Sequence, residues 1–214
     1  MYHYPNAMNI KKVIDTISHE VDTLKGNQTK DLIYSSDHIY SNERTAAHAF
    51  LRAKAKLFAV NDWSTMPGPT STFELFDAQG RPRQSDKLLV GDFIRIELPL
   101  PGNLPANWVE VTRIHVTDTE AEFTVVPCAN PQPDQQKESA PVEHFFGPEA
   151  SSTFRVERRG NRLMACEIGR NERVNNQEDT AGNRGTLNTL IAAGGWAFFQ
   201  EVQWKKLTDY LTHL

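Results

Sequence analysis

Hydrophobic positions near the start of the chain recur with the spacing of a helix. Between residues 9 and 25 they fall at i, i+3, i+4 and i+7, and Gly26 follows as a stop. A narrow apolar stripe of this kind suits either an appendage packed on the outside of a domain or a helix that pairs with a second copy of the chain. The positions are Ile10, Val13, Ile14, Ile17, Val21 and Leu24.

A second helical pattern is predicted to end near Phe58. Ser41 or Asn42 supplies an N-cap side chain for it. Asn61-Asp62 ends the pattern, and Pro67-Gly68-Pro69 prevents its resumption. One side of this helix is expected to carry Ala47, Phe50, Leu51, Lys54, Leu57 and Phe58.

After residue 69 the hydrophobic period changes from that of a helix to that of a strand. Strands joined by hairpins, with helices before and after them, predict an α+β fold rather than a parallel βαβ arrangement. A long final helix is expected over about residues 186–212. The alternating segments are 70–76, 92–98, 107–116, 120–126, 152–157 and 163–168, and a short strand is also expected at 31–36.

The segment 127–150 breaks this regularity. It holds five prolines, at positions 127, 131, 133, 141 and 148, so it is neither a central strand nor a continuous helix. Loops of this length in a folded domain are lids or binding loops, or else disordered. We therefore expect a long loop between two strands of the sheet.

Composition and charge argue against several classes of protein. The net charge is −4, which disfavours a nucleic-acid partner, and no apolar run approaches the ~20 residues of a membrane span. The N-terminus lacks the layout of a signal peptide. The two cysteines, Cys128 and Cys166, form no CxxC pair and suit a reducing, cytoplasmic setting.

Four stretches resemble one known superfamily. Ala49–Phe76 (AFLRAKAKLFAVNDWSTMPGPTSTFELF) has its helix, Trp-containing turn and following strand, and Val90–Ile96 (VGDFIRI) has the next strand. Trp108–Ile114 (WVEVTRI) and Gly194–Leu211 (GGWAFFQEVQWKKLTDYL) resemble a later strand and the last helix. Over residues 30–214 the chain thus resembles the START/Bet v 1-like (SRPBCC) superfamily, in particular its polyketide cyclase/dehydrase-like members.

The resemblance implies an α+β helix-grip fold. A curved antiparallel sheet of six to seven strands would wrap around the long C-terminal helix and enclose an apolar cavity. On this basis residues 1–8 are a flexible lead-in, 9–26 an extra N-terminal accessory helix and 30–214 a single helix-grip domain. The accessory helix, the long loop 127–150 and the polar insertion 169–185 depart from the superfamily's layout.

The sequence contains no motif for a metal, a nucleotide or an activated serine. Its seven histidines form no pair at ligand spacing, so neither a metal nor a cofactor is predicted. The most concentrated polar stretch is Ile168–Asn176. There Arg170 could hold a carboxylate or phosphate, and Glu172 could act as a general base if desolvated. Alternatively, these side chains cap the last helix and tie a loop to the body of the domain.

Aromatic residues are the other candidates. Trp63 lies in the turn between helix and sheet, either as a structural plug or as a ligand contact. In residues 92–98, Arg95 and Glu97 share one face and Ile94 and Ile96 the other, and the sequence leaves open which face is concave. The expected ligand-binding residues are Trp63, Phe73, Arg95, Trp108, Arg170, Asn171, Trp196 and Phe199.

Three functional hypotheses follow from the sequence. The first is a module that binds a small hydrophobic or amphipathic molecule, gated by the loop 127–150. The alternative is a cofactor-independent cyclase, dehydratase or hydrolase, with Glu172, Glu110 and Arg170 as catalytic candidates. The third is a protein-interaction module or homodimer that uses the accessory helix 9–26.

Overall fold

A computed structural model describes residues 30–67, 71–99, 106–132, 149–172 and 195–213 of the chain. The predicted lead-in 1–8 and accessory helix 9–26, most of the loop 127–150, and the start of the predicted last helix lie outside the described residues. The division of the chain into these segments therefore stays a prediction.

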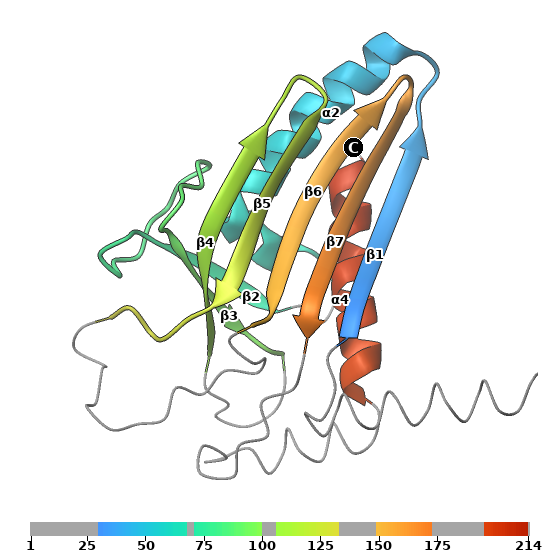
Figure 1. The fold of residues 1–214 in the computed structure, drawn as a ribbon. Coiled ribbons are helices and arrows are strands. Elements are labelled where there is room, and N and C mark those ends of the chain that lie inside the picture. The colour runs from blue at the N-terminus through green and yellow to red at the C-terminus, as the bar shows by residue number, and fades with distance from the viewer. Residues whose placement is uncertain (1–29, 68–70, 100–105, 133–148, 173–194, 214) are drawn as a thin grey trace, which may run out of the picture.

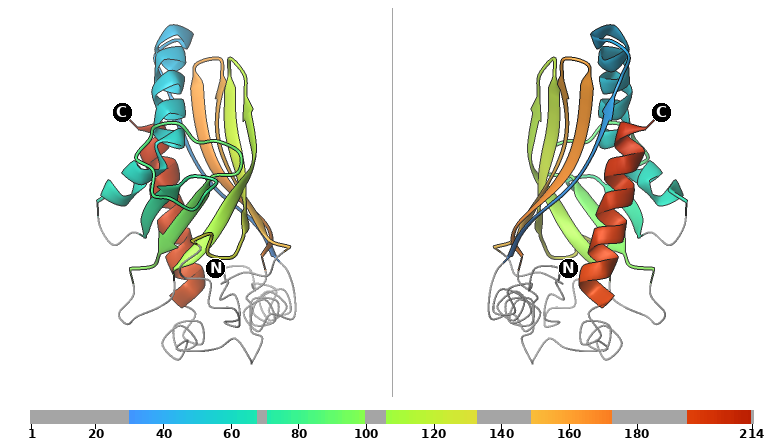
Figure 2. Two further views of the ribbon diagram at one scale, coloured as in Figure 1. Left: turned by 90° about the vertical axis from the view of Figure 1, so that its left-hand side faces the viewer. Right: turned by 90° about the vertical axis from the view of Figure 1, so that its right-hand side faces the viewer.

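Within the described residues, seven antiparallel strands form one sheet, which confirms the predicted count of six to seven (Figure 1). Their order across the sheet is β1-β7-β6-β5-β4-β3-β2, so the first strand lies beside the last one. The sheet curves, and the helices lie on the same side of it (Figure 2). The strands are β1 (Lys30–Ile39), β2 (Thr72–Phe76), β3 (Phe93–Glu97), β4 (Asn107–Val116), β5 (Glu120–Pro127), β6 (Ser151–Arg159) and β7 (Arg162–Glu172).

The helix α2 (Glu43–Phe58) begins where the sequence predicted. Asn42, rather than Ser41, is its N-cap: the Asn42 Oδ1 accepts a 2.9 Å hydrogen bond from the Thr45 N–H. The buried side differs from the prediction, because Leu51 is 55 % exposed. Small side chains dominate the buried stripe, which lets the helix approach the sheet closely. This stripe comprises Ala46, Ala49, Phe50, Ala53 and Leu57.

Strand β3 shows which face of the sheet is buried. Ile94 belongs to the core beneath the helices, whereas Arg95 lies on the opposite, outer face and pairs with Glu74 on β2 at 2.7 Å. The expected charged pair of Arg95 and Glu97 therefore does not line the space between sheet and helix. Side chains alternate between the two faces of β3, so either the isoleucine face or the face with Arg95 and Glu97 is buried. Only the isoleucine face can be buried without taking a charged side chain out of water.

The helix α4 (Gly195–Thr212) runs along the inner face and is fastened to both β1 and α2. Ser36 on β1 donates a 2.6 Å hydrogen bond to Asp209, and the Tyr40 hydroxyl donates to the Thr212 carbonyl at 3.0 Å. The side of α4 that faces the protein repeats with helical spacing. It comprises Gln200, Gln203, Leu207, Thr208, Leu211 and Thr212.

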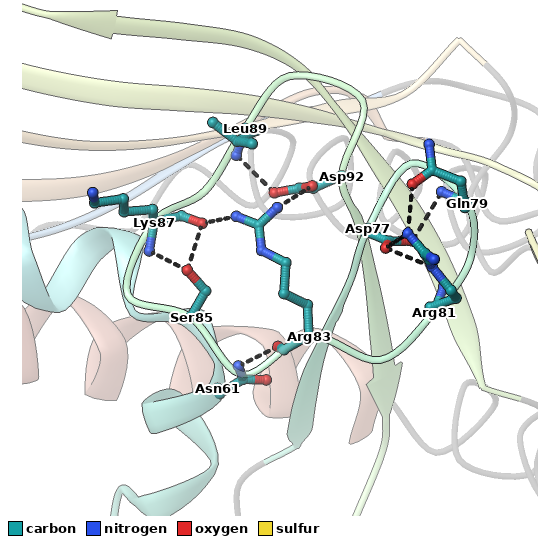
Figure 3. Close-up of polar contacts among 9 residues, drawn as sticks. All are labelled: Asn61, Asp77, Gln79, Arg81, Arg83, Ser85, Lys87, Leu89 and Asp92. Atoms are coloured by element: carbon teal, nitrogen blue, oxygen red, sulfur yellow. Dashed lines mark hydrogen bonds and ion pairs between the residues drawn. The ribbon is translucent and has the colours of Figure 1, made fainter.

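The loop between β2 and β3 is held by a buried carboxylate (Figure 3). Asp92 accepts hydrogen bonds from Arg83 at 2.9 Å and from the Leu89 N–H at 2.7 Å. Burial raises the pKa of Asp92 even though the Leu89 N–H and Arg83 act in the opposite direction. Gly91, at φ 88°, makes the turn that aims this side chain inward. The Val-Gly-Asp stretch of the sequence thus has a structural role.

Candidate functional site

Five aromatic rings from five elements meet on the inner face of the sheet. Phe154 on β6 is central: its ring centroid lies 5.2 Å from that of Trp63, 5.2 Å from that of Phe123 and 5.3 Å from that of Trp204. Phe73 joins through Trp63 at 5.4 Å. We call Trp63, Phe73, Phe123, Phe154 and Trp204 the aromatic cluster. Edge-to-face and tilted contacts of this kind stabilise the cluster beyond simple burial.

Trp63 belongs to the 3-10 helix η1 (Val60–Thr65), directly after α2. The indole is 1 % exposed, and its N–H donates to the Lys56 carbonyl at 3.0 Å. With its polar atom bonded and its ring packed against other rings, Trp63 fills one end of the core. This geometry agrees with the role of a plug, and the predicted ligand contact stays a prediction.

A carboxyl group lies beside the aromatic cluster. Glu167 on β7 is 0 % exposed, and both of its carboxylate oxygens are buried. It is directly opposite Phe154 on β6 and Tyr34 on β1, so these three side chains share the inner face. Buried carboxyl groups are unusual in folded proteins, and they concentrate at functional sites.

Sequence reasoning missed Glu167, although a signal for it was present. Leu163, Ala165 and Glu167 alternate along β7, and the first two are core residues. The period of 2 therefore places Glu167 on the core face, since a strand cannot turn one side chain outward without shifting its register. A glutamate in phase with core positions was the informative observation.

The polar candidates at the end of β7 lie elsewhere. Arg170 is exposed and pairs with Asp31 on β1 at 2.7 Å, while the Asn171 N–H donates to the same carboxylate at 3.0 Å. Both contacts lower the pKa of Asp31, and the hydrogen bond from the Asn171 N–H has the larger effect. Asn171 adopts φ 51°, a left-handed conformation that Asn tolerates better than most residues. This arrangement agrees with the structural interpretation, because Arg170 and Asn171 attach the end of β7 to Asp31 on β1. The Glu172 side chain lies outside the described residues.

Several other candidates lie on the outer face of the sheet. Arg95 is directly opposite Trp108, whose ring packs 4.7 Å from that of Phe76. Glu110 faces the same way, opposite Phe93 on β3. The structure therefore does not bring Arg95, Trp108 or Glu110 together with the aromatic cluster. Phe73 does belong to it, and the side chains of Trp196 and Phe199 lie outside the described residues.

Basic side chains near the β6–β7 hairpin are paired with acidic ones. Arg155 and Arg113 both bind the buried Glu122, at 2.6 Å and 2.5 Å. Arg159 pairs with Glu157 at 2.5 Å and Arg162 with Asp37 at 3.0 Å. Such pairing neutralises these four basic side chains, and the absence of a nucleic-acid partner stays a prediction.

The described residues offer little support for metal or thiol chemistry. Within them, no three His, Cys, Asp or Glu side chains gather in a way that could hold a metal ion. Burial raises the pKa of Cys128 to about 12 and that of Cys166 to about 11, so both thiols are protonated at neutral pH. No helix among these residues is long and apolar enough to cross a membrane.

Element order and sheet order define the class of protein. A curved antiparallel sheet whose first and last strands are neighbours, with α4 along its inner face, is an α+β helix-grip fold. The fold predicted from the sequence is thereby confirmed. No protein-family model matches the sequence, and the search of curated proteins returned no match.

Several solved structures resemble this chain. A hypothetical protein from Helicobacter pylori is 12 % identical, with all of both chains covered and a TM-score of 0.46. A norcoclaurine synthase point mutant from Thalictrum is 10 % identical over 86 % of this chain and 94 % of that one, with a TM-score of 0.43. The di-domain ARO/CYC StfQ of the steffimycin biosynthetic pathway is 7 % identical over 95 % of this chain and 55 % of that one, with a TM-score of 0.49. These similarities specify neither a ligand nor a reaction.

Proposed function

We propose that the protein binds a small amphipathic molecule between the sheet and α4, against the aromatic cluster and the carboxyl of Glu167. The burial of Glu167 beside these rings is the observation that carries the proposal. Apolar rings would hold the ligand's hydrophobic part, and the carboxyl its polar part. Small-molecule sites commonly combine an apolar lining with a few convergent polar groups in this way.

The energetics of burial support this role for Glu167. Taking a carboxyl out of water is costly, and a Leu or Met at position 167 would pack the layer without that cost. A carboxylate can accept about four hydrogen bonds. It can therefore accept a bond from a ligand amine or hydroxyl together with any bond it accepts from the protein. The polar part of the ligand is accordingly a hydrogen-bond donor.

Calorimetric titration of the full-length protein with 2-naphthylmethylamine tests the proposal. This probe joins an aromatic ring to an amine. We expect binding to the wild type and a loss of about tenfold or more in Glu167→Gln, since hydrogen bonds to charged groups contribute about 1.5–3 kcal/mol. Glu97→Gln, on the outer face, is the matched control and should bind like the wild type. No binding to the wild type, or equal binding to all three proteins, would contradict the proposal.

A second candidate function is acid/base catalysis by Glu167. A carboxyl beside apolar rings is an arrangement that enzymes use to tune proton transfer, and the earlier candidate Glu110 faces outward instead. Proton exchange offers a direct test. In D2O, an active base would remove a methyl proton of 2-acetylnaphthalene and return a deuteron, which NMR detects. Exchange in the wild type that is lost in Glu167→Gln would support this function.

Two further expectations from the sequence keep the status of proposals. The accessory helix 9–26 is proposed to support a homodimer, and the protein is proposed to be cytoplasmic. The two free cysteines of the described residues agree with a reducing location. Deleting residues 1–26 should reduce a dimer's mass to that of a monomer in light scattering. An identical association state before and after the deletion removes the dimer proposal.

A further inference from the structure

We propose that Gln203 selects for a ligand that carries a neutral hydrogen-bond acceptor, such as a carbonyl or ether oxygen. This inference rests on the proposed function, because it concerns the same layer between the sheet and α4. It concerns a different residue, however, and the opposite hydrogen-bonding role. Glu167 offers an acceptor to the ligand, whereas Gln203 offers a donor.

The orientation of the Gln203 amide follows from one hydrogen bond. The Ser71 backbone N–H donates to the Gln203 Oε1 at 2.9 Å, and this contact is buried. The side-chain oxygen must therefore point toward Ser71, which leaves the Nε2 group on the other side. Gln203 is 2 % exposed, and within the described part of the chain its Nε2 is buried without a hydrogen-bond partner.

Gln203 is distinctive among the buried polar residues of α4. Thr208 is bonded to Ser36 at 2.7 Å, and Thr212 donates to the Thr208 carbonyl at 3.0 Å. Those hydroxyls therefore serve to fasten the helix. An unbonded buried donor costs about 1–3 kcal/mol, so few occur in native proteins. A ligand acceptor placed against Nε2 would remove that cost, which gives the residue a role in binding.

The neighbours of Gln203 indicate what the ligand would look like. Trp204 follows it on α4, and Phe73 comes two residues after its partner Ser71; both rings belong to the aromatic cluster. Gln203 and its hydrogen-bond partner are thus each close in sequence to a member of that cluster. A neutral oxygen suits it better than an anion, because Gln203 is buried and offers no positive charge to compensate for taking an anion out of water. We infer an aromatic or other ring-bearing ligand with a carbonyl or ether oxygen.

A pair of probes tests this inference without knowledge of the natural ligand. 2-Acetylnaphthalene carries a carbonyl acceptor, whereas 2-ethylnaphthalene has similar shape and no acceptor. The measured quantity is the ratio of their dissociation constants in calorimetric titrations of the full-length protein. Comparing this ratio between variants cancels the difference in hydrophobicity between the two probes. It also cancels general weakening of the site.

We expect the preference for the ketone to fall by about five- to tenfold in Gln203→Met, the effect of one lost hydrogen bond. Binding of 2-ethylnaphthalene should persist in that variant. Gln200→Met, which replaces another buried glutamine one turn earlier on α4, is the matched control and should keep the wild-type ratio. An unchanged ratio in Gln203→Met would overturn the inference and leave the proposed function standing. If neither probe binds to the wild type, both are overturned.

Discussion

The ammonium group of Lys56 donates a 2.8 Å hydrogen bond to the backbone carbonyl of Tyr210, and it lies 4.4 Å from the centre of that residue's ring. It also donates to the His213 carbonyl at 2.7 Å. The last carbonyls of a helix have no partner within the helix, and a cation there is favourable. A side chain of α2 thus caps the C-terminal end of α4.

Replacing Lys56 should therefore loosen α4. We expect Lys56→Met to lower the free energy of unfolding by about 1–3 kcal/mol, because two charged hydrogen bonds are lost while the aliphatic part of the side chain is retained. Urea titration measures the change. Lys54→Met on the same helix should change the free energy of unfolding by less than about 1 kcal/mol, because its ammonium lies 6.0 Å from the centre of the Phe50 ring and such a contact is weaker than two charged hydrogen bonds. Equal shifts in the two variants would contradict the capping role.

Lowering the pH should weaken a second contact that holds α4, the hydrogen bond between Asp209 and Ser36 on β1. Burial alone would raise the pKa of Asp209, but hydrogen bonds from Ser36 and Lys205 outweigh it and hold that pKa below the ordinary value of 3.8. A lowered carboxyl pKa stabilises the folded state above the ordinary pKa, and this contribution is lost as the pH falls through the folded-state pKa. Asp209→Asn should therefore be less stable than the wild type at pH 7.

The difference in stability between the wild type and Asp209→Asn should shrink as the pH falls below about 4. Urea midpoints measured from pH 7 to pH 3 give this profile. Asp118→Asn, in the exposed β4–β5 turn, is the matched control. A difference that stays constant across this range would mean that Asp209 acts through shape rather than through its charge.

Both thiols should resist modification in the folded protein. Burial raises the pKa of each, with Glu110 adding to the effect at Cys128 and Arg155 opposing it at Cys166. Because the thiolate is the reactive form, iodoacetamide at pH 7.5 should label neither cysteine over a period in which free cysteine reacts fully. Mass spectrometry should show two additions once the protein is unfolded in guanidinium. Rapid labelling of the folded protein would show that a thiol is accessible and ionised.

The fold could be predicted because its signals are local. Alternation marked the strands β2 to β7, and Asn42 followed by a helical spacing marked α2. The buried side of α2 was harder to predict. Leu51 is more hydrophobic than the alanines that are buried, but close contact with the sheet favours small residues along that stripe. Propensity identifies a helix, whereas packing partners decide which face it buries.

The candidate site was predicted only in part, and the reason is geometric. Trp63 and Phe73 were recognised as candidates, and both lie in the aromatic cluster. Arg95 and Trp108 were also candidates, but the two faces of a strand are equivalent in sequence until the direction of curvature is known. The end of β7 drew attention as the most concentrated polar stretch of the sequence. Glu167 is a single charged residue in phase with the core positions Leu163 and Ala165, which is a weaker signal in the sequence than a concentration of charge.

Two glycines at turns allow steric crowding to be separated from backbone strain. Both adopt the left-handed conformation, Gly80 at φ 71° and Gly160 at φ 59°. A Cβ added at Gly80 would lie 2.6 Å from the Pro131 carbonyl oxygen, whereas one at Gly160 would meet nothing closer than the Glu43 Oε1 at 3.8 Å. Gly80→Ala must therefore displace the chain after β5, and Gly160→Ala need not displace anything.

Both substitutions should cost about 1 kcal/mol for the left-handed backbone. Gly80→Ala should cost about 1–3 kcal/mol more, because a backbone contact cannot be relieved by rotating a side chain. Urea unfolding of the two variants measures this difference directly. Hydrogen exchange of the Cys128 amide, which donates to the Trp108 carbonyl at 3.0 Å, should also speed up in Gly80→Ala alone. Equal stability of the two variants would mean that the segment around Pro131 moves away without cost, so that its contact with Gly80 does not hold it in place.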